Sequence, residues 1–162
     1  MPRPQCDESR MDFQIASDFQ LPATSGRQIR LSEFRGRGVI LYFYPKDNTP
    51  GCTTEGQDFR DLHGEFQAAG WEVLGISRDG LKSHETFKAK LGLPFDLLSD
   101  ADEQVCELYG VMKLKNLYGK QGRGIERSTF AVGRDGLLLK AWRGVKVPNH
   151  AREVLDFVLG QS

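Results

Sequence analysis

The chain has 162 residues, enough for one domain with a substantial apolar core. Hydrophobic residues make up 39% of it and charged residues 27%, which is typical of an ordinary soluble globular protein. Lysine plus arginine balances aspartate plus glutamate at 22 each, so no overall field attracts nucleic acid or an anionic membrane.

The first residues predict a flexible N-terminal arm over 1–11, followed by a single domain over 12–162. The arm is polar, contains prolines and lacks the apolar core of a secretory signal. Residues 27–31 alternate weakly and predict an edge strand, which runs into a short helical turn ending at Phe34. The run VILYFY at 39–44 predicts a central strand covered on both faces. It is far too short to cross a bilayer, so we expect a cytoplasmic protein.

Helices and strands then alternate along the chain. Apolar residues recur at three- and four-residue steps from Thr53 to Ala69, which predicts an amphipathic helix. The turn sequence GRDG separates the last two predicted strands and predicts a hairpin. The remaining predicted strands cover 71–76, 95–98, 125–132 and 137–142, and the remaining predicted helices cover 83–91, 102–109 and a closing segment from Ala151.

This order predicts the fold class. Alternating strand and helix require parallel crossovers, whereas the hairpin adds an antiparallel pair. We therefore predict an α/β, thioredoxin-like fold, with a mixed central β-sheet flanked by helices on both faces. In such a sheet, the loop after the first parallel strand is the usual position of the functional site.

The cysteines and histidines indicate neither a disulfide framework nor a metal centre. Cys6, Cys52 and Cys106 are few and scattered, and no CxxC occurs. The three histidines have no metal-ligand spacing with one another or with a cysteine. We expect no metal and no cofactor, and each thiol must be considered individually.

Cys52 stands where the predicted central strand ends and a helix begins, and this position predicts a reactive sulfur. Unpaired backbone N–H groups and the helix dipole both favour a thiolate there. Pro45 and Pro50 stiffen the approach loop. Thr49 can put a hydroxyl beside the sulfur, to donate to a thiolate or to a bound oxygen, although it could also merely cap the turn.

Ionisation alone does not explain a fast reaction at Cys52. A free cysteine is already a few per cent thiolate, so full ionisation gains at most roughly 30-fold, or about 2 kcal/mol. Further rate must come from donors that stabilise charge developing on the substrate. Arg127, in GIERSTF, is the best candidate cation, because it is a charged residue on a strand otherwise destined for the core. It could instead pair with Glu126 or Glu55 on a solvated face.

The segment YPKDNTPGCTTE resembles the active-site loop of the peroxiredoxins, whose pattern Pro-x-x-x-Thr-x-x-Cys is matched by Pro45, Thr49 and Cys52. Further matches, in GISRD, LLSDAD, YGV and GIERSTF, extend the resemblance over nearly the whole chain. Within that superfamily the chain looks like the peroxiredoxin Q group, also called bacterioferritin comigratory proteins. The resemblance implies a thioredoxin fold and the reduction of hydrogen peroxide or organic hydroperoxides, with a cysteine sulfenic acid at Cys52. Arg127 matches the family's active-site arginine and Glu55 its helix glutamate.

The chain departs from the family where a second cysteine would stand. Many members carry a resolving cysteine at the place of Gln57 or of Lys88, and both places are vacant here. We hypothesise a one-cysteine mechanism, in which an external thiol such as glutathione, a glutaredoxin or a thioredoxin regenerates the enzyme. Cys106 is a rival resolver or a buried thiol. Cys6, in the arm, could reach Cys52 or another chain, or be an incidental surface thiol.

A second class of function stays open, a redox-sensing binding module of the same fold whose cysteine signals through a partner. A disulfide oxidoreductase fits less well, because such enzymes normally use CxxC. We expect a monomer, or at most a weak dimer, with no nucleic-acid or membrane partner. Tyr44 is predicted to support the site as core or pocket wall, His84 to begin a helix without chemistry, and the basic segment 113–123 to be a solvated loop.

Overall fold

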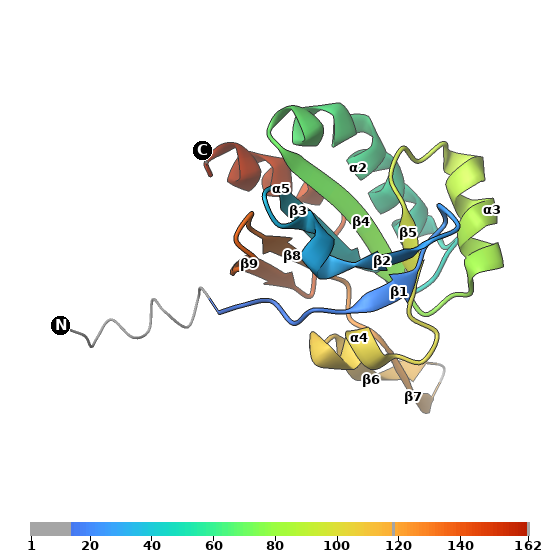
Figure 1. Ribbon diagram of the computed structural model, residues 1–162. Coiled ribbons are helices and arrows are strands. Elements are labelled where there is room, and N and C mark those ends of the chain that lie inside the picture. Colours follow the sequence, from blue (N-terminus) through green and yellow to red (C-terminus); the bar gives the residue numbers. More distant parts are fainter. Residues whose placement is uncertain (1–13, 118, 162) are drawn as a thin grey trace.

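The computed structural model describes residues 14–117 and 119–161, and a mixed five-stranded sheet forms its centre (Figure 1). The strands lie in the order β5 (Leu97–Ser99), β4 (Trp71–Ser77), β3 (Gly38–Phe43), β8 (Ser128–Val132) and β9 (Leu138–Arg143). Strands β3, β4 and β5 are parallel, while β8 runs antiparallel to β3 and β9 antiparallel to β8. The predicted mixed sheet is confirmed. Cys6 and the predicted arm lie outside the described residues.

Strand β3 divides the apolar core into two. All six of its residues are buried, and the side chains of successive residues point to opposite faces. Val39, Leu41 and Phe43 enter one core, whereas Ile40 and Tyr42 enter the other. This explains why the sequence is apolar at every position of the strand.

Helices cover both faces of the sheet, as predicted (Figure 1). The face toward Tyr42 packs against α2 (Pro50–Ala68), α3 (Leu81–Leu91) and α5 (His150–Leu159). The opposite face packs against β1 (Gln20–Pro22), β2 (Gln28–Arg30), the 3-10 helix η1 (Leu31–Phe34) and α4 (Gln104–Leu108). No helix within the described ranges is long and apolar enough to cross a membrane.

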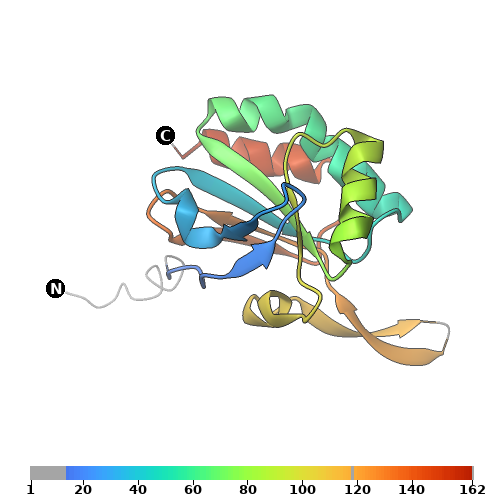
Figure 2. The ribbon, with the colours of Figure 1, turned by 45° about the vertical axis from the view of Figure 1, so that its right-hand side comes forward.

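The prediction of a solvated loop over 113–123 is wrong. Strands β6 (Met112–Leu117) and β7 (Lys120–Ile125) pair antiparallel there, and Figure 2 shows this ribbon extending away from the body. Its strands pair with each other rather than with the central sheet, so most of the described side chains on β7 are exposed and basic or polar. The sequence therefore lacks the apolar alternation that identifies a half-buried strand.

Among the predicted boundaries that differ from the structure, two concern the surroundings of Cys52 and Arg127. Helix α2 begins at Pro50 rather than Thr53, and proline suits the first helical position because the missing N–H would have no partner there. The single strand predicted over 125–132 is divided, since β7 ends at Ile125 and β8 begins at Ser128. Arg127 therefore lies in a two-residue connection and not within a strand.

Gly75 of β4 lets the Tyr42 ring lie flat against the neighbouring strand. A Cβ atom at Gly75 would lie 2.7 Å from Leu97 Cδ2 and 2.9 Å from Tyr42 Cζ. We expect Gly75→Ala to lower the free energy of unfolding by about 1 to 3 kcal/mol, because a well-packed core resists an added methyl group. Urea denaturation measures this effect.

Gly64 offers the matched control on the exposed surface of α2. A Cβ atom there meets nothing within 4 Å, so Gly64→Ala should raise the free energy of unfolding by up to about 1 kcal/mol through helix propensity. Equal stability of Gly75→Ala and the wild type would contradict the packing account.

Candidate active site

Cys52 is the third residue of α2, and the loop from the carboxyl end of β3 places it there. Thr49 is the N-cap, with extended backbone angles, and its carbonyl accepts the hydrogen bond from Thr53 N at 2.9 Å. The Cys52 side chain joins the core on the Tyr42 face and is 2% exposed. The sulfur is thus held at a helix N-terminus, where backbone N–H groups and the dipole favour negative charge.

Arg127 reaches this sulfur from a distant part of the chain. The pairing of Phe43 with Ser128 brings the start of β8 to the end of β3, so Arg127 lies at the same edge as Cys52. Its Nη2 donates to Cys52 Sγ at 3.5 Å, and its Nη1 donates to Glu55 Oε1 at 2.5 Å. The guanidinium therefore bridges a thiol and a carboxylate. Of the alternative, the pairing with Glu55 is confirmed, but the solvated face is wrong, because the Arg127 and Glu55 side chains are only 16% and 1% exposed.

Gly51 leaves room for that guanidinium. A Cβ atom at Gly51 would lie 3.1 Å from Arg127 Nη2, and the next atom of the same group is 3.9 Å away. A side chain at this position would push the cation away from the first turn of α2. The sequence PGC therefore combines a helix-starting proline with room for the cation that contacts the sulfur.

Of the charged groups around Cys52, Glu55 is the one whose charge changes near neutral pH. Burial raises the pKa of Glu55 to about 7, although Arg127 acts in the opposite direction. Burial also works against the charge on Arg127, but Glu55 and Cys52 outweigh it and raise the pKa of Arg127. Arg127 is thus a permanent cation, while Glu55 exchanges a proton near neutral pH. When Glu55 is protonated, it still accepts the hydrogen bond from Arg127, but its negative charge no longer competes with a Cys52 thiolate for the cation.

Ionisation of Glu55 should make stability depend on pH. Because its folded-state pKa is about 7 and its ordinary value is 4.5, Glu55 lowers the free energy of unfolding progressively as pH rises from 4.5 to 7. The loss is about 3 kcal/mol at most. In Glu55→Gln this loss should disappear, as urea denaturation at several pH values would measure. Asp61→Asn, at an exposed position of the same helix, is the control; parallel curves for Glu55→Gln and the wild type would contradict the assignment.

Thr49 has a different hydrogen-bonding role from the one expected. Its hydroxyl donates to Lys46 O at 2.8 Å, so its single hydrogen is engaged within the loop. The expected donation to sulfur is not made, and the side chain makes no capping hydrogen bond either. What remains are the lone pairs of Oγ1, which can accept a hydrogen bond from an incoming ligand. Pro45 lies half-buried at the start of the same loop.

Tyr44 belongs to the core around Cys52 and is 1% exposed, so the interpretation as core or pocket wall is confirmed. Burial raises the pKa of Tyr44 well above its ordinary value, and the hydroxyl keeps its hydrogen. That hydrogen is donated to Asp47 Oδ1 at 2.6 Å. Asp47 is a residue that sequence reasoning missed, although a charged side chain between Pro45 and Thr49 was a usable signal.

Among the described residues, Cys106 is the other cysteine, and it does not lie beside Cys52. Cys106 is 0% exposed and belongs to the core on the opposite face of the sheet. Burial, together with Asp100, raises the pKa of the Cys106 thiol far above its ordinary range, so this thiol stays protonated. Lys88, at a place where the resemblance to the peroxiredoxins implies a resolving cysteine, forms an ion pair with Asp96 at 3.1 Å.

Comparison with known proteins shows the family to which the chain belongs. Residues 14–141 match the model of the AhpC/TSA family. The chain is 51% identical over 142 residues to the putative peroxiredoxin bcp of Coxiella burnetii, covering 88% of this chain and 94% of the relative. It is 52% identical over 142 residues to peroxiredoxin Bcp of Xanthomonas campestris, covering 86% and 89%.

The solved structures agree with these relatives. A structure of the Xanthomonas campestris bacterioferritin comigratory protein, described for its alkyl peroxide reduction activity, is 49% identical. It superimposes with a TM-score of 0.84 over 88% of this chain and 90% of the other. The thioredoxin-like fold predicted from the element order is the fold of these neighbours.

Proposed function

This chain belongs to the AhpC/TSA family and is a thiol-dependent peroxidase of the peroxiredoxin Bcp type, and we propose that Cys52 is its peroxidatic residue. The observation that carries the assignment is the contact of Arg127 Nη2 with Cys52 Sγ, at 3.5 Å and at a helix N-terminus. A cation and backbone N–H groups there both favour a thiolate, which is the nucleophilic form of cysteine.

The proposed reaction begins with attack of the Cys52 thiolate on the terminal oxygen of a hydroperoxide. An S–O bond forms as the O–O bond breaks, and the departing alkoxide or hydroxide takes a proton to leave as alcohol or water. Cys52 becomes a sulfenic acid, so sulfur is oxidised as the peroxide is reduced. The free lone pairs of Thr49 Oγ1 can accept the peroxide O–H, and Arg127 can stabilise charge on the reacting oxygens.

The supporting residues act through this pair. Glu55 orients Arg127 through their ion pair, and Pro45 and Tyr44 shape the loop and the wall behind Cys52. Hydrogen peroxide and organic hydroperoxides are the proposed substrates. The relative described for alkyl peroxide reduction supports the organic class.

We propose a one-cysteine cycle, in which a thiol from outside the chain reduces the sulfenic acid. The two places at which the resemblance implies a resolving cysteine hold Gln57 and Lys88, and Cys106 lies across the sheet from Cys52. Bonding the two sulfurs would require opening both cores. Glutathione, a glutaredoxin or a thioredoxin is the proposed reductant, and the proposed enzyme is a monomer or weak dimer, which sedimentation velocity would measure.

Mass spectrometry of protein treated with peroxide in the absence of thiol tests the cycle. The expected product is Cys52 as sulfenic acid and then as overoxidised forms, with Cys106 still reduced. Cys6→Ala and Cys106→Ala should give the same product as the wild type. A Cys52–Cys106 or Cys52–Cys6 disulfide as the main product would overturn the one-cysteine proposal. The reductant is identified separately, by comparing peroxide turnover with glutathione and glutaredoxin as electron source with turnover with thioredoxin.

A further inference from the structure

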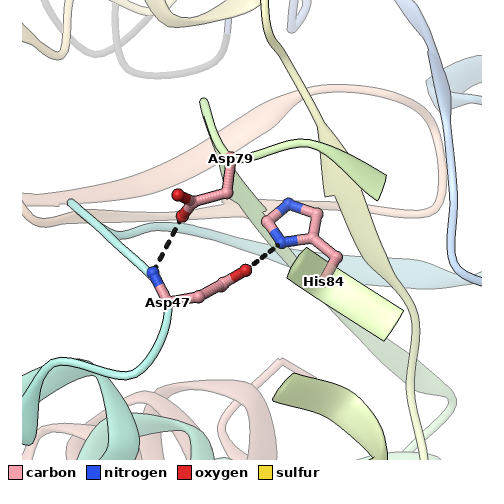
Figure 3. A group of neighbouring side chains, drawn as sticks. All are labelled: Asp47, Asp79 and His84. Carbon is pink, nitrogen blue, oxygen red and sulfur yellow. Dashed lines mark hydrogen bonds and ion pairs between the residues drawn. The ribbon is translucent and has the colours of Figure 1, made fainter. Parts of the chain in front are cut away.

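Three polar side chains meet beside the loop that leads to Cys52, each from a different segment (Figure 3). Asp47 lies in this loop, Asp79 follows β4, and His84 lies in the first turn of α3. His84 Nδ1 lies 2.7 Å from Asp47 Oδ2, and Asp47 N donates to Asp79 Oδ2 at 2.8 Å. The side chains of His84 and Asp47 are 0% and 1% exposed.

The cluster has the residue types of a cation site, yet its ligand atoms are already engaged. Asp47 Oδ1 accepts from Tyr44, and Asp47 Oδ2 accepts from Ser83 Oγ at 2.8 Å in addition to facing His84. Asp79 Oδ2 accepts from Ser77 Oγ at 2.8 Å as well as from Asp47 N. Protein donors already satisfy these oxygen atoms, which indicates a hydrogen-bonded connection between the loop, the segment after β4 and α3 rather than a metal site.

Hydrogen bonds from several segments surround the Asp47–His84 pair. His84 Nε2 lies 2.9 Å from Leu98 O, and a carbonyl oxygen only accepts, so Nε2 carries a hydrogen. Burial works to raise the pKa of Asp47, but hydrogen bonds from His84, Tyr44 and Ser83 outweigh it and hold that pKa below its ordinary value. An ionised Asp47 only accepts hydrogen bonds, and its Oδ2 faces His84 Nδ1 at 2.7 Å in a buried position.

Asp47 is the main connection between its loop and the rest of the protein. Within the described chain, the other side-chain link from residues 45–49 to α3 is an exposed contact of Lys90 with Asn48, at 3.5 Å. Asp47 alone bonds to the segment after β4 and to both Ser83 and His84 of α3. Asn48 has a φ of +66°, a strained conformation that the neighbouring bonds must hold.

We propose that the Asp47–His84 pair is a positioning element for peroxide reduction, which holds the loop so that Thr49 faces the substrate of Cys52. Asp47 lies two residues before Thr49, and Thr49 is the N-cap of the helix that carries the sulfur. A small displacement of the loop would move the Thr49 hydroxyl away from the position in which its lone pairs can accept a hydrogen bond from the substrate. The inference rests on the proposed role of Cys52.

Two rate constants of Cys52, for hydrogen peroxide and for iodoacetamide, distinguish a loss of loop positioning from a general loss of structure. Reaction with hydrogen peroxide requires the aligned loop, whereas alkylation by iodoacetamide requires only an accessible thiolate. In Asp47→Ala, the peroxide rate constant should fall about 10- to 100-fold, as expected for a misplaced catalytic group, while alkylation does not fall, because a looser loop leaves the buried sulfur no less accessible. His84→Ala should have the same effect, and the double variant should be no slower than either single variant.

Asp47→Asn distinguishes position from charge. The amide keeps the size of the side chain, its oxygen can still accept from Tyr44, and its nitrogen can donate to Ser83 Oγ in place of the bond that Asp47 accepts, so Asp47→Asn should recover much of the lost peroxide rate. If a nearby negative charge were what mattered, Asp47→Asn would be as slow as Asp47→Ala. That result would overturn the proposal, and so would an unchanged ratio of the two rate constants in Asp47→Ala.

His63→Ala is the matched control, because His63 is a second buried histidine paired with a carboxylate, Glu72, at 2.6 Å. It lies on α2 but outside the loop, so its loss should lower the melting temperature without changing the ratio of rate constants. If Asp47→Ala fails to fold, Asp79→Ala replaces it. A lower ratio of the peroxide rate constant to the alkylation rate constant in Asp79→Ala would support the positioning role of the loop contacts, and an unchanged ratio would overturn it. A wild type whose peroxide reaction does not involve Cys52 would instead refute the proposed function.

Discussion

Replacing Cys52 with serine should lower peroxide reduction by at least about a thousandfold while the fold is retained. A serine hydroxyl is not ionised near neutral pH, so the helix N-terminus and Arg127 have no anion to stabilise. Serine nearly matches the volume of the buried cysteine and can accept the same hydrogen bond from Arg127. Peroxide consumption with a thiol reductant measures the loss, and circular dichroism measures the fold.

Cys106→Ala is the matched control, since Cys106 is equally buried but belongs to the opposite core. Its thiol is held protonated, so removing it should leave turnover near that of the wild type. If Cys52→Ser consumed peroxide as fast as the wild type, the peroxidatic assignment would be wrong. The redox-sensing binding module would then be the better account of Cys52.

Local sequence predicts the part of the site that is local in the chain. Pro45, Thr49 and Cys52 lie within eight residues, and the end of a strand followed by a helix start fixes their relative places. The apolar run of β3 also predicts the central strand, because both of its faces are buried. Within such a segment, backbone geometry and burial act on the same residues that the sequence displays.

Contacts between distant segments were harder to predict. Arg127 was a candidate because of its charge, but its bond to Glu55 spans 72 residues and depends on the register of β8 against β3. The pairing of Asp47 with His84 spans 37 residues and gives no periodic signal. His84 was predicted to begin a helix without chemistry, whereas it is a buried partner of the active-site loop. Pairwise electrostatics of this kind follows from the fold and not from local pattern.

Arg127→Gln should lower the rate constant of Cys52 with hydrogen peroxide by about 100- to 1000-fold, the effect of removing a preorganised charge-stabilising donor. The variant takes a cation from Cys52 and from Glu55 together, because one guanidinium serves both. Loss of that cation raises the pKa of Glu55 further above 7, since Arg127 is the group that lowers it. Stopped-flow measurement of the peroxide reaction gives the rate, and Arg127→Lys should recover little, because an ammonium cannot form the planar bridge.

A second substitution at Glu55 should restore the stability of Arg127→Gln without restoring its peroxide rate. Arg127→Gln leaves a buried carboxyl without a cation, which should cost up to about 3 kcal/mol, limited by the ability of Glu55 to take up a proton. Arg127→Gln/Glu55→Gln removes that buried charge and should recover stability, while the peroxide rate stays low because no cation faces the sulfur. Arg123→Gln, in the exposed ribbon and bonded to Glu103, is the control and should keep the wild-type rate. Recovery of the rate in the double variant would mean that Arg127 serves to neutralise Glu55 rather than to assist Cys52.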